Sequence, residues 1–349
     1  HEGRGHEGYS SMVKTRLTLQ GYQDPQTAKG WLKSRDVEAW ILDLYPSIVL
    51  HYDLAAHDLE SSGQDPSTCA SPFQQAYTQA AARAFFFFLD PRRLDRVSVD
   101  SLVSSPITDA LLEVTLTAEE DGGLTEQELT DLANNWFSPD SVRRVLDHFR
   151  ELDTSSPTST QAGEGGGAVG GGVTREALKL FQGLTLDPPR ALTATFIDRL
   201  FEEVPTTKAN TKVTTKDDQG GEGGGGEQVL GFGGFLDLTL AFEFLGSPQS
   251  LRYFWACLDV KRQGYLDRFT VQYFYQDVVE GLRSEGLEAP DLCDVVDEIF
   301  DMAKPERPDR VTCADLERSK TAHTVVSMLI DVNAFWLYEN RENLIHYDS

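Results

Sequence analysis

The chain has 349 residues, of which 40% are hydrophobic and 10% aromatic, and this length is sufficient for about two domains with substantial cores. Its formal net charge of −25 repels phosphate backbones and anionic lipids, which argues against binding to nucleic acid or membranes and favours basic partners. No apolar run approaches the roughly 20 residues that cross a bilayer, and the four cysteines, none in a C-x-x-C pair, are typical of a cytoplasmic protein with reduced thiols: Cys69, Cys257, Cys293 and Cys313.

Polar, glycine-rich residues open the chain, and residues 1–16 are therefore expected to form a flexible tail. From residue 28 onward, apolar residues recur at helical spacing and strand-like alternation is scarce, which predicts a mainly α-helical fold. A serine followed by proline marks the expected start of two helices, at Ser138-Pro139 and at Ser247-Pro248. A further apolar stripe at helical spacing, over 292–300, indicates a helix packed against the core.

Two glycine-rich stretches, 154–172 and 206–228, interrupt the helical pattern and are expected to be flexible. We assign neither a phosphate-binding role, because the first lacks the lysine that follows the glycines of a P-loop and the second does not lead into a complete G-x-G-x-x-G motif. The chain is therefore expected to comprise an N-terminal helical lobe over 17–153 and a C-terminal lobe over 173–349, which contains the second insert.

The segment LDVKRQGYLDRF, residues 258–269, has the outline of the calcium-binding loop of an EF-hand. That loop needs oxygen ligands at positions 1, 3, 5, 7 and often 9, a glycine at 6 and a bidentate glutamate at 12. Four candidate ligands stand at positions 1, 5, 7 and 9: Asp259, Gln263, Tyr265 and Asp267. However, Lys261 places a cation at position 3, and Thr270 cannot act as the clamp at position 12. The sequence predicts a loop that keeps the shape of an EF-hand without its ion.

The same outline recurs at three other places. One loop begins at Asp90 and has Val97 at position 8, and another begins at Asp153 and resumes at Val173 after the first insert. A third has the apolar Val311 at position 8 and Asp315 at position 12. Residues unsuited to calcium stand where ligands belong: Arg92, Leu94, Ser101, Ala177, Lys304 and Pro308. These loops are expected to hold two helices together and to bind no ion.

One acidic stretch, TAEEDGGLTEQEL, has the most complete ligand set in the chain. Thr117 stands at position 1, and three carboxylates follow at positions 3, 5 and 12: Glu119, Asp121 and Glu128. The helix expected to precede it is poorly patterned, and an acidic connecting loop produces such matches by chance. Calcium binding and a chance match both remain open for this stretch, and no other cofactor is expected.

From about residue 70 to the end, several motifs are shared with a known family. They are NWFSPDSVRRVLDHFRELD, FIDRLFEE, LDVKRQGYLDRFTVQYFY, DVVDEIFDMAKPERPDRVTCADL and TVVSMLIDVNAFWLYENRE. On these motifs the chain resembles the B'' regulatory subunits of protein phosphatase 2A, and most of all their gamma class. The resemblance implies an elongated helical protein, built from degenerate EF-hand pairs, that docks onto the scaffold and catalytic subunits of the phosphatase. Members of the family have at least one well-liganded EF-hand, from which this chain departs.

No motif points to catalysis by the chain itself. It has neither the G-D-x-x-D-R nor the G-N-H-E run of metallophosphatases, and His51 and His57 are spaced too far apart to share one helical face as a zinc pair. We therefore expect no enzyme, but a regulatory protein that brings the phosphatase to substrates or to a cytoskeletal site. Two alternatives remain: a structural adaptor among microtubule-associated proteins of a cilium or centrosome, and a stand-alone calcium sensor.

Overall fold

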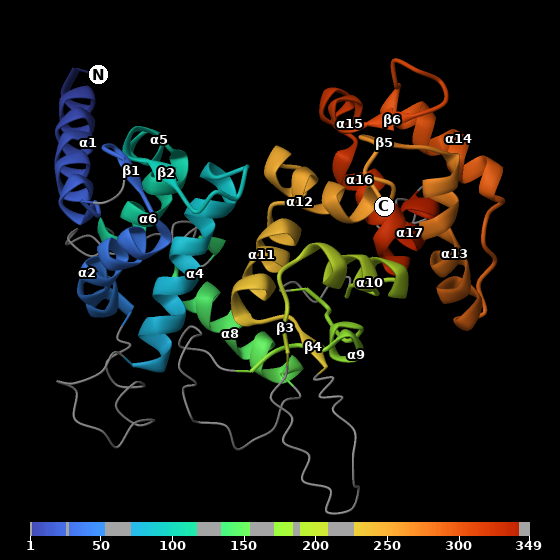
Figure 1. Ribbon diagram of the computed structural model, residues 1–349, viewed down its shortest axis with the longest axis horizontal. Coiled ribbons are helices and arrows are strands. Elements are labelled where there is room, and N and C mark those ends of the chain that lie inside the picture. Colours follow the sequence, from blue (N-terminus) through green and yellow to red (C-terminus); the bar gives the residue numbers. More distant parts are fainter. Residues whose placement is uncertain are drawn as a thin grey trace, which may run out of the picture. The chain divides into compact units, whose positions relative to one another are not determined.

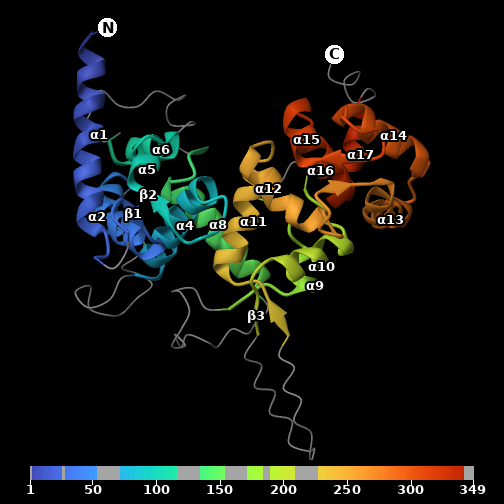
Figure 2. The same cartoon turned by 45° about the horizontal axis from the view of Figure 1, so that its top comes forward.

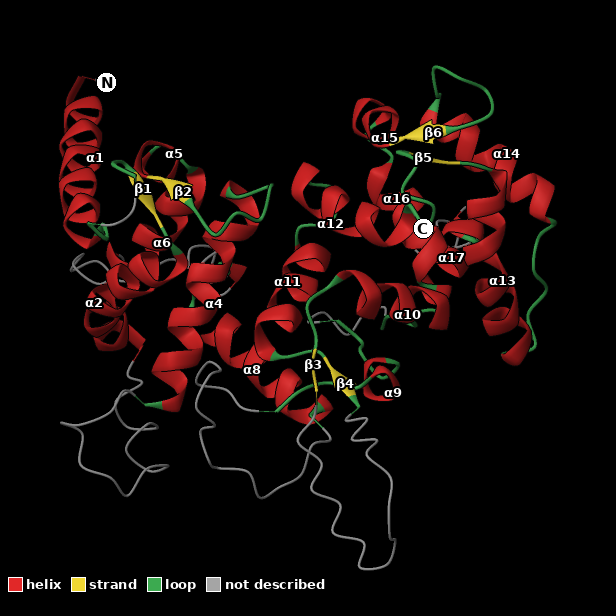
Figure 3. Cartoon of the chain, in the orientation of Figure 1, coloured by secondary structure: helices red, strands yellow, loops and turns green. Residues whose placement is uncertain are grey.

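A computed structural model describes seven stretches of the chain, and within them the fold is mainly α-helical, as predicted: 2–25, 28–52, 71–116, 134–153, 171–183, 189–208 and 227–341. The described strands are two residues long each (Figure 3). The described residues form two compact units, the first ending at Asp147 and the second beginning at His148. No helix in the described part of the chain is both long and apolar enough to cross a membrane.

The first unit contains two helix–strand–helix segments joined by a short antiparallel ladder. Trp31 pairs with Ser98 and Leu32 with Val97, which places the two loops back to back. The elements are α1 (Glu2–Tyr22), β1 (Trp31–Leu32), α2 (Ser34–Tyr52), α4 (Pro72–Leu89), β2 (Val97–Ser98), α5 (Val99–Val103), α6 (Pro106–Leu116) and α8 (Pro139–Leu152), the last of which continues into the second unit.

Helix α1 corrects the flexible tail expected for residues 1–16. Its glycines lower helix propensity, which is why the sequence pointed to a tail. The helix is held by its C-terminal half, where Leu19 is fully buried and Arg16 forms an ion pair with Asp100 at the start of α5. Packing against α2 and α5 therefore outweighs the unfavourable local propensity.

The second unit begins with another pair of helix–loop–helix segments. Val173 and Leu230 form an antiparallel bridge, with N–H to O distances of 2.9 and 2.8 Å, and both side chains are fully buried. The rings of Phe149, Phe181 and Phe235 pack together beneath this bridge. The elements are the end of α8, α9 (Arg175–Leu178), α10 (Ala194–Glu203), β3 (Thr207–Lys208), β4 (Gln228–Val229) and α11 (Phe232–Glu243).

A further pair of segments follows and completes this unit. The strands β5 (Tyr265–Leu266) and β6 (Val311–Thr312) pair antiparallel, with Leu266 opposite Val311. Helix α13 packs against α14, α16 and α17, and these helices lie together in both Figure 1 and Figure 2. The helices are α12 (Pro248–Leu258), α13 (Arg268–Ser284), α14 (Leu292–Ala303), α15 (Cys313–Ser319), α16 (Ala322–Ile330) and α17 (Val332–Glu339).

Both predicted serine-proline helix starts are confirmed. The Ser138 Oγ accepts a hydrogen bond from the Ser141 N–H at 3.1 Å, and the Ser247 Oγ accepts one from the Ser250 N–H at 3.1 Å. Proline follows each serine as the first helical residue, where its missing N–H has no partner to lose. These caps fix the residues at which α8 and α12 begin.

Candidate functional site

The paired loops at Leu266 and Val311 form the candidate site, because they bring the sequence-predicted ligand positions together. Both apolar residues are fully buried, and each stands at position 8 of its loop, as predicted. The other two loop pairs repeat this arrangement with Leu32 beside Val97 and Val173 beside Leu230. Buried apolar contacts and a short backbone ladder therefore hold each pair of loops together.

The first loop of the site folds around Asp259. Its carboxylate accepts the Gln263 N–H at 2.9 Å and the Gly264 N–H at 2.7 Å, and the residue is only 9% exposed. Gly264 has φ of +80°, a conformation that strains any residue with a Cβ. The turn expected at position 6 of an EF-hand loop is thus present, and backbone donors bind the carboxylate at position 1.

In the same loop, the lysine at position 3 binds the aspartate at position 9. The Lys261 Nζ lies 3.0 Å from the Asp267 Oδ2 and 4.2 Å from the centre of the Phe269 ring. The Asp267 Oδ1 accepts the Thr270 N–H at 2.8 Å and so caps α13. Burial alone would raise the pKa of Asp267, but the hydrogen bonds from Thr270 and Lys261 outweigh it and lower this pKa to about 2. Asp267 is thus held as an anion that is already paired.

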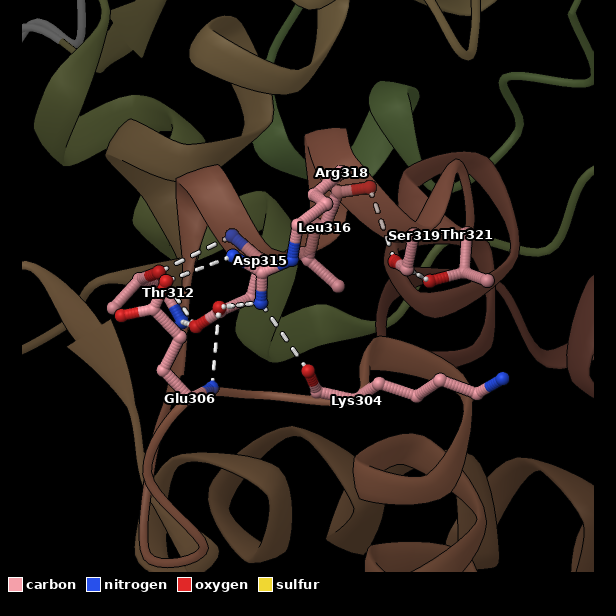
Figure 4. A network of polar contacts seen from close by, with 8 residues as sticks. All are labelled: Lys304, Glu306, Thr312, Asp315, Leu316, Arg318, Ser319 and Thr321. Atoms are coloured by element: carbon pink, nitrogen blue, oxygen red, sulfur yellow. Dashed lines mark hydrogen bonds and ion pairs between the residues drawn. The ribbon is translucent and has the colours of Figure 1, made fainter.

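An arginine from the helix that follows the second loop binds residues of that loop. The Arg318 guanidinium donates to the Asp315 Oδ1 at 2.5 Å, the Glu306 Oε1 at 3.1 Å and the Lys304 carbonyl at 3.2 Å (Figure 4). Asp315 also accepts the Thr312 N–H at 2.9 Å, which completes a capping box at the start of α15. Burial raises the pKa of Asp315, while hydrogen bonds from Thr312 and Arg318 lower it, and the net direction is down.

These donor sets do not fit calcium, which needs six to eight oxygen ligands with no cation among them. The remaining candidates of the first loop are also engaged, since the Gln263 Nε2 donates to the Tyr265 carbonyl at 3.3 Å and lies 3.4 Å from Asp267. Among the described residues, no group of three or more His, Cys, Asp and Glu side chains is placed to hold a metal ion. The absence of calcium from these loops stays a prediction.

Some predicted residues lie outside the described part of the chain. They are the acidic stretch with Thr117, Glu119, Asp121 and Glu128, the second histidine of the rejected zinc pair, His57, and Cys69. The side chain of His51 is likewise not described, although its backbone belongs to α2. Calcium binding by the acidic stretch therefore remains an open prediction.

Sequence reasoning missed the degenerate loop that ends at Asp36 and whose described residues are Pro25 and 28–36. Gly30 has φ of +84°, Leu32 is buried at position 8, and the Asp36 Oδ2 accepts the Lys33 N–H at 2.8 Å. Gly264 and Leu266 occupy the same positions, 6 and 8, in the first loop of the candidate site. Asp315 occupies position 12 of the second loop, as Asp36 does here. The spacing of glycine, apolar residue and acid was visible in the sequence, but proline at position 1 hid it.

The motif at the end of the chain also acts as a clamp inside the second unit. Asp331 is 1% exposed, and its Oδ1 accepts the Ala191 N–H at 3.0 Å and the Asn333 N–H at 3.1 Å. Its Oδ2 pairs with the Arg190 guanidinium at 3.3 Å. One carboxylate therefore caps α17 and fixes the segment that leads into α10. This contact links the two loop pairs of the unit.

Comparisons with known proteins identify several that are similar in sequence to this chain. No family model matches it. It is 32% identical over 336 residues to the gamma-class B'' regulatory subunit of serine/threonine-protein phosphatase 2A from Xenopus tropicalis, and 30% identical to the human protein of the same name. It is also 31% identical to TON2 from Arabidopsis thaliana, a probable B'' regulatory protein of this phosphatase. Each match covers 96% of this chain but only 61%, 60% and 59% of the respective relatives, so the chain spans about three fifths of their length.

A solved structure supports the fold independently. A chain of a PP2A PR70 holoenzyme, labelled diCa, superimposes with a TM-score of 0.62 at 17% identity, covering 92% of this chain and 96% of that one. At this identity the likeness bears on the fold alone, and it confirms the helical architecture. The sequence matches confirm the resemblance carried by the motifs: along 96% of its length the chain is similar to gamma-class B'' regulatory subunits of protein phosphatase 2A.

Proposed function

We propose that the chain is a non-catalytic regulatory protein that docks a protein phosphatase 2A core enzyme to its substrates. The observation that carries this proposal is the similarity to gamma-class B'' proteins along 96% of the chain. Those relatives are named regulatory subunits of a serine/threonine phosphatase. The partners of the chain would then be the scaffold and catalytic subunits, and the latter would supply the hydrolysis.

The structure supports a role in positioning. Helical segments joined by buried loop ladders form rigid units, and rigid units hold a bound enzyme at a defined place relative to its target. Such tethering raises the local concentration of substrate without any chemistry in the tethering chain. The net charge of −25 would favour basic substrates, with an effect that weakens as salt rises.

Calcium control does not form part of this proposal. The related holoenzyme structure is named as a two-calcium form, whereas here Lys261 stands at a ligand position of the first loop and Arg318, from α15, binds residues at ligand positions of the second. We therefore propose that docking is independent of calcium. The cytoplasm, and within it a cytoskeletal site such as a cilium or centrosome, is the proposed location.

The test is affinity capture of the full-length native protein, with and without a calcium chelator, followed by mass spectrometry. Scaffold and catalytic phosphatase subunits at one copy each per captured chain, retained in chelator, would support the proposal. Their absence in both conditions would overturn it, and tubulin-associated proteins in their place would establish the adaptor alternative. Loss of the phosphatase in chelator alone would refute the claim of calcium independence while leaving the docking role.

A further inference from the structure

Three ligand positions of the loop over 304–315 converge on the guanidinium of Arg318. In a calcium-loaded EF-hand, the residues at positions 1, 3 and 12 contact the ion. Here those residues are Lys304, Glu306 and Asp315, and the Lys304 backbone carbonyl and the two carboxylates lie 3.2, 3.1 and 2.5 Å from the nitrogens of Arg318. Figure 4 draws these contacts as dashed lines, separate from those that join Ser319 to Leu316 and Thr321. A single positive group therefore replaces the ion in bridging the start of the loop to its end.

The local structure makes this bridge specific. Arg318 stands one helical turn after Asp315 in α15, so its side chain can reach back to the loop that precedes the helix. The planar guanidinium offers several donors in a fixed arrangement, which suits simultaneous contact with two carboxylates and a carbonyl. Asp315 is 3% exposed, and a buried carboxylate needs a paired cation.

The partner loop contains a second cation, at a different place in the loop. Lys261 stands at position 3 and binds Asp267 at position 9, with its ammonium also over the Phe269 ring. The two loops are joined through Leu266 and Val311, so the two cations lie on opposite members of one paired unit.

We propose that Arg318 and Lys261 are internal cations that replace calcium in this loop pair, so that the pair stays assembled whether or not calcium is present. The unit would be a permanently closed EF-hand pair, in which α15 and α13 are fixed to their loops by the chain's own charges. This inference concerns the chain alone and holds whether or not the phosphatase binds.

The test uses hydrogen exchange of the full chain, measured by mass spectrometry on peptides covering 258–270 and 304–318. In Arg318→Ala, the peptide over 304–318 should exchange about tenfold faster, because hydrogen bonds to charged groups are worth roughly 1.5–3 kcal/mol and about 1.4 kcal/mol is a factor of ten. Millimolar calcium should not slow this exchange, because Lys304 and Pro308 still stand at positions 1 and 5 of the loop. The wild-type protein should exchange equally in calcium and in chelator.

Arg252→Ala is the matched control, because Arg252 is 48% exposed at its side chain, against 49% for Arg318, and pairs with Glu317 of the same helix at 3.9 Å. It should exchange like the wild type and show no response to calcium. Arg318→Lys, which keeps the charge, should retain most of the protection and guards against a general folding defect. Equal exchange in the two alanine variants, or calcium-dependent protection in the wild type, would each overturn the proposal.

Discussion

Restoring two ligand positions should convert the loop over 259–270 into a calcium site. The double variant Lys261→Asp, Thr270→Glu removes the internal ammonium and supplies carboxylates at positions 3 and 12. Asp259 and Asp267 already stand at positions 1 and 9, and Gly264 already makes the turn. The variant should therefore bind calcium, whereas the wild-type loop should not.

The size of the effect can be worked out from burial. The pair formed by Lys261 and Asp267 is 42% and 25% exposed, so its loss costs at most about 1 kcal/mol. Thr270 is 2% exposed, and a glutamate there buries a polar group at a cost of about 1–3 kcal/mol. In chelator the variant should thus be about 1–4 kcal/mol less stable than the wild type. Calcium at 100 times its Kd should return about 2.7 kcal/mol.

Thermal unfolding in calcium and in chelator measures this difference. The variant should gain roughly 5–10 °C in Tm with calcium, the shift typical of such an energy in a domain of 150–250 residues. Lys261→Ala, Thr270→Ala is the matched control, since it removes the same groups without adding ligands, and calcium should not stabilise it. If the double carboxylate variant shows no calcium-dependent Tm, these two positions are not what prevents binding, and the reasoning fails.

Three further predictions concern other contacts in the second unit. Leu266→Ala should lower the free energy of unfolding by about 2–5 kcal/mol in urea, equally with and without calcium, because the residue is fully buried. Burial lowers the pKa of His148 below its usual 6.5, so the unfolded chain binds more protons, and stability should fall as pH drops below about 6.5; His148→Phe should remove part of this pH dependence in urea titrations. Asp331→Asn should cost about 1–3 kcal/mol in the same assay, because a neutral amide cannot pair with Arg190.

Each of these has a clear contrary result. A calcium-dependent effect of Leu266→Ala would mean that an ion, and not apolar contact, organises the loops. An unchanged pH profile in His148→Phe would show that another group causes the acid sensitivity. An Asp331→Asn protein as stable as the wild type would show that the clamp between α17 and the segment before α10 is dispensable.

The position-8 residues were predictable because apolar side chains before and after a loop follow a fixed spacing. Val97, Val173, Leu266 and Val311 all pair across loops as the pattern indicates. Arg318 was not predictable in the same way, because it lies outside the loop and acts through a side chain that folds back by one turn. Long-range partners of this kind depend on three-dimensional contact, which spacing along the sequence does not encode.

Two other failures had local causes. The glycines near the N-terminus indicated a tail, yet the buried Leu19 holds α1 against its neighbours. The loop with Gly30 and Leu32 escaped notice because its first position is a proline. In both cases tertiary packing outweighed a local signal that argued for another structure.

The bridge between Val173 and Leu230 also determines what the chain tolerates upstream of it. Once this bridge and the buried phenylalanines fix the register, the number of residues between Asp153 and Val173 no longer affects how the helices pack. Each doubling of such a connection costs only about 0.6 kcal/mol in closure entropy. Among the described residues of this connection, Gly171 and Gly172 are constrained, since a Cβ at Gly172 would lie 2.6 Å from Val229 and Gly171 has φ of +100°. The length of this connection can therefore vary among relatives at little cost in stability. A fluorescent or affinity tag inserted before Gly171 should leave the fold intact.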